Sequence, residues 1–290
     1  MGEGSLENKE SVLEAPSCLV CGEHKNRLAY SWPKSLPHEV VRCVRCGFHY
    51  LSPRPQESAM LEVYRDEAYY REGAGPGYAG YETQERSLRR TFARFMQNLE
   101  KRGLTGGRLL EVGCGFGYLL QEAAPFFEER EGTDFSQAAV DRASRAADRV
   151  YLGGCEVLPP GRRYDCIVAN HVIEHVYRPE PFLKELTGRL RSGGHLVVTT
   201  PDMGSFWRRC MGKRWPSFKI PEHVAYYDGR SLASLMTRAG LSEPRPLPFP
   251  HAFPLSLVAA KLGISFRGAL GSINLWLPKT TLALWSRSNP

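Results

Sequence analysis

The sequence predicts an α/β fold in which a mainly parallel sheet is covered by helices on both faces. From Arg108 onward, short apolar runs alternate with segments of helical periodicity, which is the pattern of strands and crossover helices. A glycine-rich turn follows the first of these runs, and Asp134 follows the second. Both features are typical of sheets that bind nucleotides at the carboxyl ends of their strands.

The composition is that of an ordinary globular protein. The chain has 290 residues, 42% hydrophobic and 24% charged, which excludes a disordered, collagen-like or coiled-coil chain. Its 38 basic and 31 acidic side chains give a net charge of +7, which favours acidic partners without identifying one. The first ten residues lack the apolar core of a secretory signal, and no uncharged apolar run reaches the ~18 residues that span a bilayer. We therefore expect a cytoplasmic protein without a transmembrane segment.

Two cysteine pairs near the N-terminus predict a structural zinc site. Cys18 and Cys21 form one Cys-x-x-Cys turn, Cys43 and Cys46 form the other, and a glycine follows each. Two such turns offer four sulfur ligands in a tetrahedron and leave no open coordination position. Redox activity would need only one pair, and metal-free thiols would not explain both trailing glycines. Because so small a unit has little core of its own, the metal would supply its folding energy.

The remaining elements are predicted in chain order. The cysteine module is expected over residues 1–56, and a helical linker or cap over 57–102. Within the linker, one helix is expected at 58–70 and a longer one at 81–102, separated by a glycine-rich break. The α/β domain is expected over residues 103–290. Its strands are expected at 109–112, 127–132, 165–169 and 195–200, with a last, antiparallel strand at 280–286.

The segment 109–120 carries the best-defined functional pattern. Gly113, Gly115 and Gly117 lie between a strand and a helix, where the backbone can turn sharply and approach a ligand. Glu111 belongs to the strand, two positions before the first glycine. Asp134 follows the second strand, where a carboxylate can accept hydrogen bonds from both hydroxyls of a ribose. No basic residue flanks Asp134, which argues against a 2′-phosphate.

These motifs together resemble the Rossmann-like, class I S-adenosylmethionine-dependent methyltransferases. In Glu111-Val-Gly-Cys-Gly-Phe-Gly117 an acid precedes the glycines by two positions, whereas NAD enzymes generally use a different glycine spacing. The blocks 164–176 and 190–202 are also similar. The run 43–55 resembles the bacterial subgroup with an N-terminal zinc-ribbon-like module. The resemblance extends from Cys18 to about Leu241 and implies a seven-stranded sheet with helices on both faces.

The resemblance also implies how the cofactor is held. The glycine turn would approach the methionine part of S-adenosylmethionine, Glu111 would fix its amino group, Asp134 would hold the ribose and Phe135 would flank the adenine. Many relatives have an acid after the third strand, where this chain has Gly154, so Glu156 or a backbone carbonyl would take that role. The residues assigned to the cofactor are Glu111, Gly113, Cys114, Gly115, Gly117, Asp134, Phe135, Glu156 and Asn170.

His171 is the first candidate for the base that deprotonates the methyl acceptor. A sulfonium methyl group is already activated, so the enzyme mainly has to align the acceptor and, where needed, remove its proton. His171, Glu174 and His175 follow the fourth strand and are expected on one face of the next helix, whose N-terminus would keep the His171 ring neutral. Two alternatives stay open. The three side chains could bind a metal, as an acid-acid-His set does in some ubiquinone-pathway O-methyltransferases that look similar here, or Glu174 and His175 could only hydrogen-bond within the fold.

The long segment 203–223 is expected to be a lid-like insertion after the fifth strand. Its aromatic and cationic side chains could grip an anionic or aromatic acceptor, with a solvated basic surface as the alternative. His223 closes the segment and is the second catalytic candidate. A later apolar helix at 255–266 is expected to belong to the core, with a cover over the acceptor or a peripheral lipid contact as alternatives.

The sequence therefore predicts a methyltransferase with a small-molecule acceptor, with O-methylation of a natural product, sugar or lipid-linked intermediate as the first choice. An RNA methyltransferase would use the zinc module and the +7 charge, but the basic residues of the module are scattered, so nucleic acid is disfavoured as a partner. A non-catalytic protein that binds S-adenosylmethionine is the third class. The intact set of Glu111, glycines and Asp134 argues against it.

Overall fold

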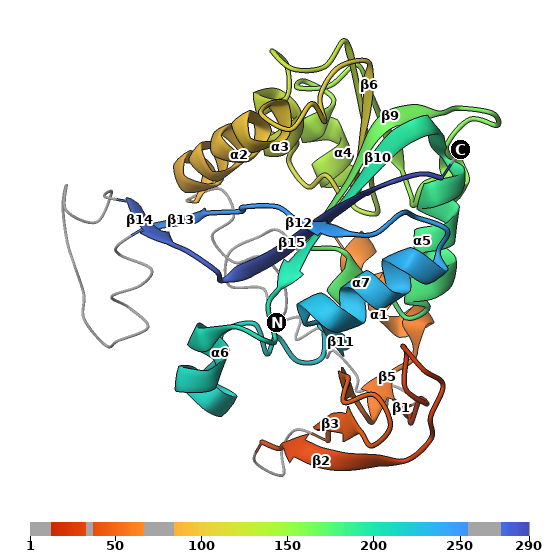
Figure 1. Cartoon of the computed structure of the whole chain (residues 1–290), viewed down its shortest axis with the longest axis vertical. Helices are drawn as coiled ribbons and strands as arrows, with labels where there is room; N and C mark the ends of the chain where they lie inside the picture. Colours follow the sequence, from red (N-terminus) through yellow and green to blue (C-terminus); the bar gives the residue numbers. More distant parts are fainter. Residues whose placement is uncertain (1–12, 33–36, 67–83, 255–273, 290) are drawn as a thin grey trace, which may run out of the picture.

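A seven-stranded sheet forms the centre of the protein, in the order β12-β15-β10-β9-β6-β7-β8 (Figure 1). The computed structural model describes residues 13–32, 37–66, 84–254 and 274–289. Five strands run parallel: β6 (Arg108–Val112), β7 (Glu129–Asp134), β8 (Arg149–Leu152), β9 (Tyr164–Asn170) and β10 (Leu190–Pro201). The antiparallel strands are β15 (Thr281–Arg287), beside β10, and β12 (Arg245–Pro246), beside β15. The predicted seven-stranded α/β sheet and its antiparallel last strand are confirmed.

Helices cover both faces of this sheet, as predicted. Successive residues of a strand point to opposite faces, so apolar strands such as β6 contribute side chains to two hydrophobic clusters, one on each face. Leu110 packs in a cluster with α5 (Pro179–Gly188) and α7 (Gly229–Arg238). Its neighbour Leu109 packs in the opposite cluster with α2 (Glu85–Glu100), α3 (Tyr118–Glu122) and α4 (Gln137–Ala143). Helix α2 contributes Phe92, Phe95, Met96 and Leu99, which lie at helical spacing and are buried.

Several predicted boundaries shift. The second strand begins at Glu129 rather than at 127, because Phe127 packs into the core from the turn that precedes the strand. The first linker helix is α1 (Glu57–Arg65), and α2 begins at Glu85 within the predicted span. The helix expected at 255–266 lies outside the described residues. None of the described helices combines the length and the apolar character needed to cross a membrane.

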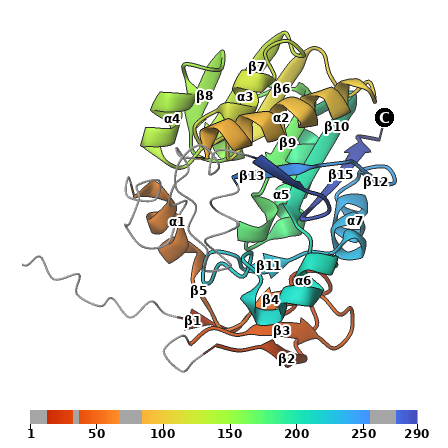
Figure 2. The same ribbon diagram turned by 90° about the vertical axis from the view of Figure 1, so that its left-hand side faces the viewer.

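The N-terminal cysteine module forms a four-stranded antiparallel sheet that includes a strand from the α/β domain. Its strands are β2 (Asn26–Tyr30), β3 (Val40–Cys43), β4 (His49–Leu51) and β11 (Ala225–Tyr226). Beside it, β1 (Leu13–Glu14) pairs with β5 (Arg54–Pro55). Figures 1 and 2 place this module at the end of the molecule away from α2, α3 and α4. Because β11 follows segment 203–223, the module and the α/β domain share backbone hydrogen bonds.

Short elements complete the described chain. The segment after β10 contains α6 (Phe206–Met211) and a 3-10 helix, η4 (Gly212–Arg214). Two further 3-10 helices, η2 (Cys155–Val157) and η3 (Ile173–His175), follow β8 and β9. A hairpin-like pair, β13 (His251–Pro254) and β14 (Asn274–Leu277), lies outside the main sheet and was not predicted.

Candidate functional site

A cavity of about 780 Å³ opens at the carboxyl ends of β6, β7, β8 and β9. Ligands of open α/β sheets bind at this edge, because the turns after the strands converge there. The cavity brings together nearly all the residues that the sequence assigned to the cofactor or to catalysis: Glu111, Gly113, Cys114, Gly115, Asp134, Phe135, Glu156, Asn170, His171 and His223. Gly117 is not among the lining residues. It begins α3 with φ +75°, and a Cβ there would lie 2.9 Å from the Cα of Ala143, so its place is explained by helix packing.

Glu111 brings a buried carboxyl group to the cavity. Its side chain is only 2% exposed, and Oε2 has no hydrogen-bond partner in the described part of the chain. Burial raises the pKa of Glu111 well above its ordinary value, and the nearby Asp134 carboxylate raises it further. The turn after it needs glycine at position 113, where φ is +68° and a Cβ would lie 2.7 Å from Val172. A buried, unsatisfied carboxyl beside an open cavity fits an ammonium group as its partner.

Asp134 joins the two turns that border the cavity. Its Oδ2 accepts a hydrogen bond from the amide of Gly115 at 2.9 Å, and its Oδ1 accepts one from the amide of Ser136 at 3.0 Å. Ser136 in turn caps α4 by accepting from the amide of Ala139. The carboxylate is thus fixed by backbone donors at the end of β7, where the sequence predicted it.

The turn after β8 places Glu156 where a side chain of residue 154 would lie. The amide of Gly154 donates to Glu156 Oε1 at 2.8 Å. A Cβ on residue 154 would lie 2.5 Å from Glu156 Oε2 and 3.2 Å from the ring of Phe135. The absence of a side chain at position 154 therefore leaves room for the Glu156 carboxylate at this turn.

The turn after β9 is not the helix that the sequence predicted. His171 has φ +55°, and the next element is the single 3-10 turn η3, while the α-helix α5 begins only at Pro179. The prediction that His171 lies at a helix N-terminus was wrong, because Thr199 on the neighbouring strand binds the His171 amide through both its carbonyl and its hydroxyl oxygen. The hydroxyl of Thr199 also donates to Oδ1 of Asn170 at 2.7 Å, which fixes the end of the strand.

His171 faces the cavity and is paired with a buried carboxylate. Its Nδ1 lies 3.1 Å from Oε1 of Glu174, and Nε2 lies 3.5 Å from the hydroxyl of Thr281. Burial alone would raise the pKa of Glu174, but the hydrogen bond from His171 and the adjacent imidazoles lower it to about 2. Because the carboxylate can only accept, Nδ1 carries the proton and Nε2 keeps its lone pair.

His175 contacts a different partner, the imidazole of His223. The two rings meet edge to face, with centroids 4.7 Å apart. Nδ1 of His175 donates to the carbonyl of Glu222 at 3.1 Å, and Nδ1 of His223 donates to the carbonyl of Ser217 at 2.8 Å. Burial lowers the pKa of both imidazoles and so favours their neutral form. The three side chains expected on one helix face therefore separate: His171 pairs with Glu174, and His175 packs against His223.

Several cavity residues were not found by sequence reasoning. Phe249, His251 and Phe253 line the wall beside His171, and the rings of His171 and His251 are 6.4 Å apart. These three residues alternate as strand residues do, but Pro250 between them and Pro254 after them hide the pattern. Tyr64 of α1 contributes a hydroxyl 3.0 Å from Nδ1 of His175.

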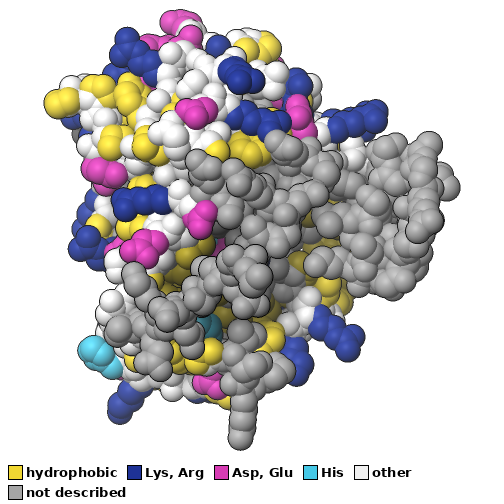
Figure 3. All heavy atoms as spheres, turned by 180° about the vertical axis from the view of Figure 1, so that it is seen from behind, with side chains coloured by type: hydrophobic (Ala, Val, Ile, Leu, Met, Phe, Trp, Pro, Cys, Tyr) yellow, Lys and Arg dark blue, Asp and Glu magenta, His cyan; other side chains and the backbone are white. Residues whose placement is uncertain are grey.

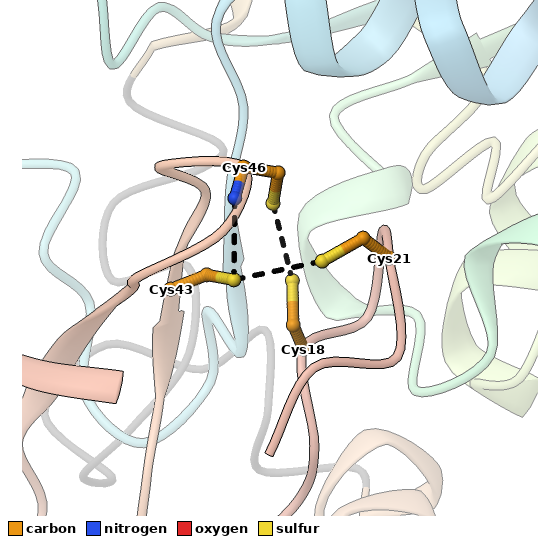
Figure 4. A group of neighbouring side chains, drawn as sticks. All are labelled: Cys18, Cys21, Cys43 and Cys46. Carbon is orange, nitrogen blue, oxygen red and sulfur yellow. Dashed lines mark hydrogen bonds between the residues drawn. The ribbon is translucent and has the colours of Figure 1, made fainter. Parts of the chain in front are cut away.

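The four N-terminal cysteines converge, as Figure 4 shows. One sulfur from each lies within 4.8 Å of the others, with Cys18 to Cys46 and Cys21 to Cys43 at 3.5 Å. A tetrahedral zinc with Zn–S bonds of about 2.3 Å needs sulfurs about 3.8 Å apart, so these residues fit such an ion. The trailing glycines, Gly22 and Gly47, both have positive φ and close the two turns.

Comparisons with known proteins identify the family. A family model described as a methyltransferase domain matches residues 82–242, more than half of the chain. A ubiquinone biosynthesis O-methyltransferase of Bradyrhizobium diazoefficiens is 29% identical over 134 residues, which cover 44% of this chain and 49% of that protein. A probable S-adenosylmethionine-dependent methyltransferase of Mycolicibacterium smegmatis is 30% identical over 161 residues, or 54% of this chain and 61% of that protein. The chain thus spans about half the length of the curated relatives it matches.

Solved structures agree in fold. A possible histamine N-methyltransferase of Thermotoga maritima superposes with a TM-score of 0.53 at 21% identity, covering 72% of this chain and 94% of that one. Magnesium protoporphyrin IX methyltransferase of Synechocystis, with bound SAH, gives 0.53 at 15% identity, covering 81% and 100%. The chain therefore belongs to the methyltransferase domain family and has the fold of class I S-adenosylmethionine-dependent methyltransferases.

Proposed function

We propose that this protein transfers a methyl group from S-adenosylmethionine to a small-molecule acceptor, with a hydroxyl oxygen as the first candidate. The observation that carries the proposal is the shared cavity: Glu111, whose Oε2 has no hydrogen-bond partner among the described residues, and the imidazole of His171 line the same space. The name of the Bradyrhizobium relative supports oxygen as the acceptor atom. The cavity volume of about 780 Å³ suits a cofactor together with a small acceptor.

The cofactor would be held by the turns after the first four strands. Glu111 would bind its ammonium group, and the backbone at Gly113, Cys114 and Gly115 would approach its methionine part. Asp134 would accept from the ribose hydroxyls, since it is already oriented by two backbone amides. Phe135 would flank the adenine, Glu156 would accept from its amino group, and Asn170 would close the wall at the end of β9. When bound, the cofactor supplies an activated sulfonium methyl group.

His171 would act as the general base. The acceptor O–H proton would pass to Nε2 as the oxygen attacks the methyl carbon and the sulfur–carbon bond breaks. The hydrogen bond from Nδ1 to Glu174 fixes the tautomer and stabilises the imidazolium that forms, which is the role of the acid in Ser-His-Asp triads. Support for this assignment comes from the buried carboxylate rather than from a helix N-terminus.

We also propose that residues 1–56 form a zinc-ribbon-like module with one structural zinc on Cys18, Cys21, Cys43 and Cys46. Their clustered sulfurs support this ligand set. The surface drawn in Figure 3 favours a small acceptor over nucleic acid, because the Lys and Arg side chains visible there are interspersed with Asp and Glu.

The function is tested by labelling. Purified protein is incubated with S-adenosylmethionine that carries a trideuteromethyl group and with a protein-free metabolite extract of the cells that express it. Mass spectrometry should reveal a small molecule that carries the label. At limiting cofactor the same product should form much more slowly with Asp134→Ala. Label found only in RNA would replace the small-molecule acceptor, and no labelled product from any fraction would contradict methyl transfer.

A further inference from the structure

A second cluster of potential metal ligands lies beside the catalytic candidates, apart from the cysteines. Glu174, His175 and His223 each offer one ligand atom, and these atoms lie within 4.8 Å of one another. Glu174 is 1% exposed and His223 is 4% exposed, yet all three residues line the cavity. The three therefore form a largely buried group that faces the ligand space on one side.

The two histidines are oriented as metal ligands usually are. The Nδ1–H of each ring donates to a backbone carbonyl, that of Glu222 for His175 and that of Ser217 for His223. Such a bond fixes the tautomer and leaves Nε2 with its lone pair. The hydroxyl of Tyr64 lies 3.0 Å from Nδ1 of His175, the same nitrogen that donates to Glu222.

Glu174 completes the group with an oxygen that no described residue satisfies. Its Oε1 binds the ring of His171, but its Oε2 is fully buried and has no hydrogen-bond partner in the described ranges. A buried carboxylate oxygen without a donor is costly. A cation would satisfy the carboxylate oxygen and both ring nitrogens together.

We propose that Glu174, His175 and His223 bind one divalent transition-metal ion whose remaining coordination position faces the cavity and takes an oxygen of the methyl acceptor. Two imidazoles and one carboxylate suit Zn²⁺ and its first-row neighbours, whereas Mg²⁺ and Ca²⁺ prefer oxygen ligands. Three protein ligands beside an open space form an open site, unlike the closed set of four cysteines. The ligand set differs from the alternative considered from the sequence, His171, Glu174 and His175, because Nδ1 of His171 is bonded to Glu174 and His223 takes its place. The site goes beyond the proposed methyl transfer, since it concerns how the acceptor is held.

Cobalt(II) titration of the full-length protein, after removal of bound metal under reducing conditions, tests the proposal. Cobalt on four thiolates gives intense sulfur-to-metal charge-transfer absorption as well as d–d bands, whereas cobalt on two imidazoles and a carboxylate gives weaker d–d bands without charge transfer. We expect two equivalents per chain: one brings the charge-transfer absorption, and the other adds d–d absorption alone. Glu174→Gln and His223→Ala should each lose the d–d signature of the open site and keep the charge-transfer signature. His251→Ala, which alters the same cavity outside the cluster, should keep both.

The controls keep the proposal open to refutation. If His223→Ala does not fold, the near-isosteric Glu174→Gln decides, with its thermal unfolding compared with that of the wild type. The proposal is overturned if the wild type binds cobalt only through thiolates, or if folded Glu174→Gln still binds the second equivalent with its added d–d absorption. Calorimetry of S-adenosylmethionine binding on the same samples separates the two proposals, because loss of cofactor binding in the wild type would contradict the methyltransferase and leave the metal result unchanged.

Discussion

The backbone amide of Val224 donates a hydrogen bond to the carbonyl oxygen of Glu174 at 2.9 Å. The carbonyl oxygen of the same Val224 accepts from the amide of Leu51 in the cysteine module at 3.0 Å. Ala225 then pairs with Tyr50, so β11 belongs to the sheet of the module. Val224, the residue after His223, thus links the cavity wall at Glu174 to the cysteine module at Leu51.

This connection predicts the effect of breaking the cysteine cluster. Cys43→Ser should abolish zinc binding at the cysteine cluster, lower the thermal midpoint and increase hydrogen exchange at the amide of Val224, because metal binding supplies folding free energy to the module. Elemental analysis and exchange mass spectrometry measure these changes. Cys210→Ser is the matched control, since Cys210 is exposed in α6 and lies outside the cluster. Unchanged zinc content in Cys43→Ser would contradict the assignment.

Asp134→Ala should weaken S-adenosylmethionine binding by about 1.5–3 kcal/mol, the scale of hydrogen bonds to a charged group. The loss has two sources, because Asp134 would hold the ribose and also fixes the amide of Gly115. Isothermal calorimetry measures the dissociation constant. Asp141→Ala serves as the control, since Asp141 is exposed on α4 and bonds only to Gln137 among the hydrogen bonds described for its side chain. Equal affinity of wild type and Asp134→Ala would rule out the ribose role.

Glu111 should release a proton when the cofactor binds. Its pKa is raised by burial and by Asp134, so the folded, ligand-free protein binds more protons than the unfolded chain between the ordinary glutamate pKa and the raised one. Its contribution to unfolding free energy therefore falls as pH rises through that window. A bound ammonium favours the carboxylate and lowers this pKa again, so cofactor affinity should rise with pH.

Calorimetry in buffers of different ionisation enthalpy measures that proton release. In Glu111→Gln, which keeps the shape but cannot titrate, the buffer dependence should disappear and the affinity should fall. Buffer-independent binding heats in the wild type within this pH window would show that Glu111 is already ionised before binding.

The parts of the fold that depend on local pattern could be predicted from the sequence. Apolar strands, the glycine turn and the acid at the end of β7 follow directly from residue type and spacing, and the sheet confirms them. Contacts between distant segments could not be predicted in this way. Thr199 draws the His171 amide onto β10 and prevents a helix there, although the spacing of His171, Glu174 and His175 has a helical period.

The contact between His175 and His223 could not be predicted from the sequence either. His223 lies 48 positions after His175. Hydrogen bonds from the Val224 amide to the Glu174 carbonyl and from His175 to the Glu222 carbonyl hold the two segments together. The wall at His251 was missed because two-residue alternation is interrupted by prolines, so a strand was not recognised.

Glu156 should contribute to recognition of the adenine amino group. If its carboxylate accepts from that group, the wild type should bind S-adenosylhomocysteine more tightly than its inosine analogue by about 1.5–3 kcal/mol, and Glu156→Ala, which removes the acceptor, should lose most of this preference. Gly154→Ala tests the geometry separately, because a methyl group there would displace the Glu156 carboxylate. Equal discrimination in wild type and Glu156→Ala would assign the amino group to another acceptor.

His171→Ala should lower turnover of the labelled acceptor by roughly 10²–10⁴ and leave cofactor affinity nearly unchanged, because it removes proton transfer and no cofactor contact. His171→Asn should restore little activity, since an amide can orient a hydroxyl but cannot accept its proton at working pH. His195→Ala is the control, because His195 lies on β10 and does not line the cavity. Single-turnover measurements with saturating cofactor separate the methyl-transfer step from product release. If both His171 variants keep near-normal rates while His223→Ala loses activity, the essential imidazole is that of His223, at the end of segment 203–223.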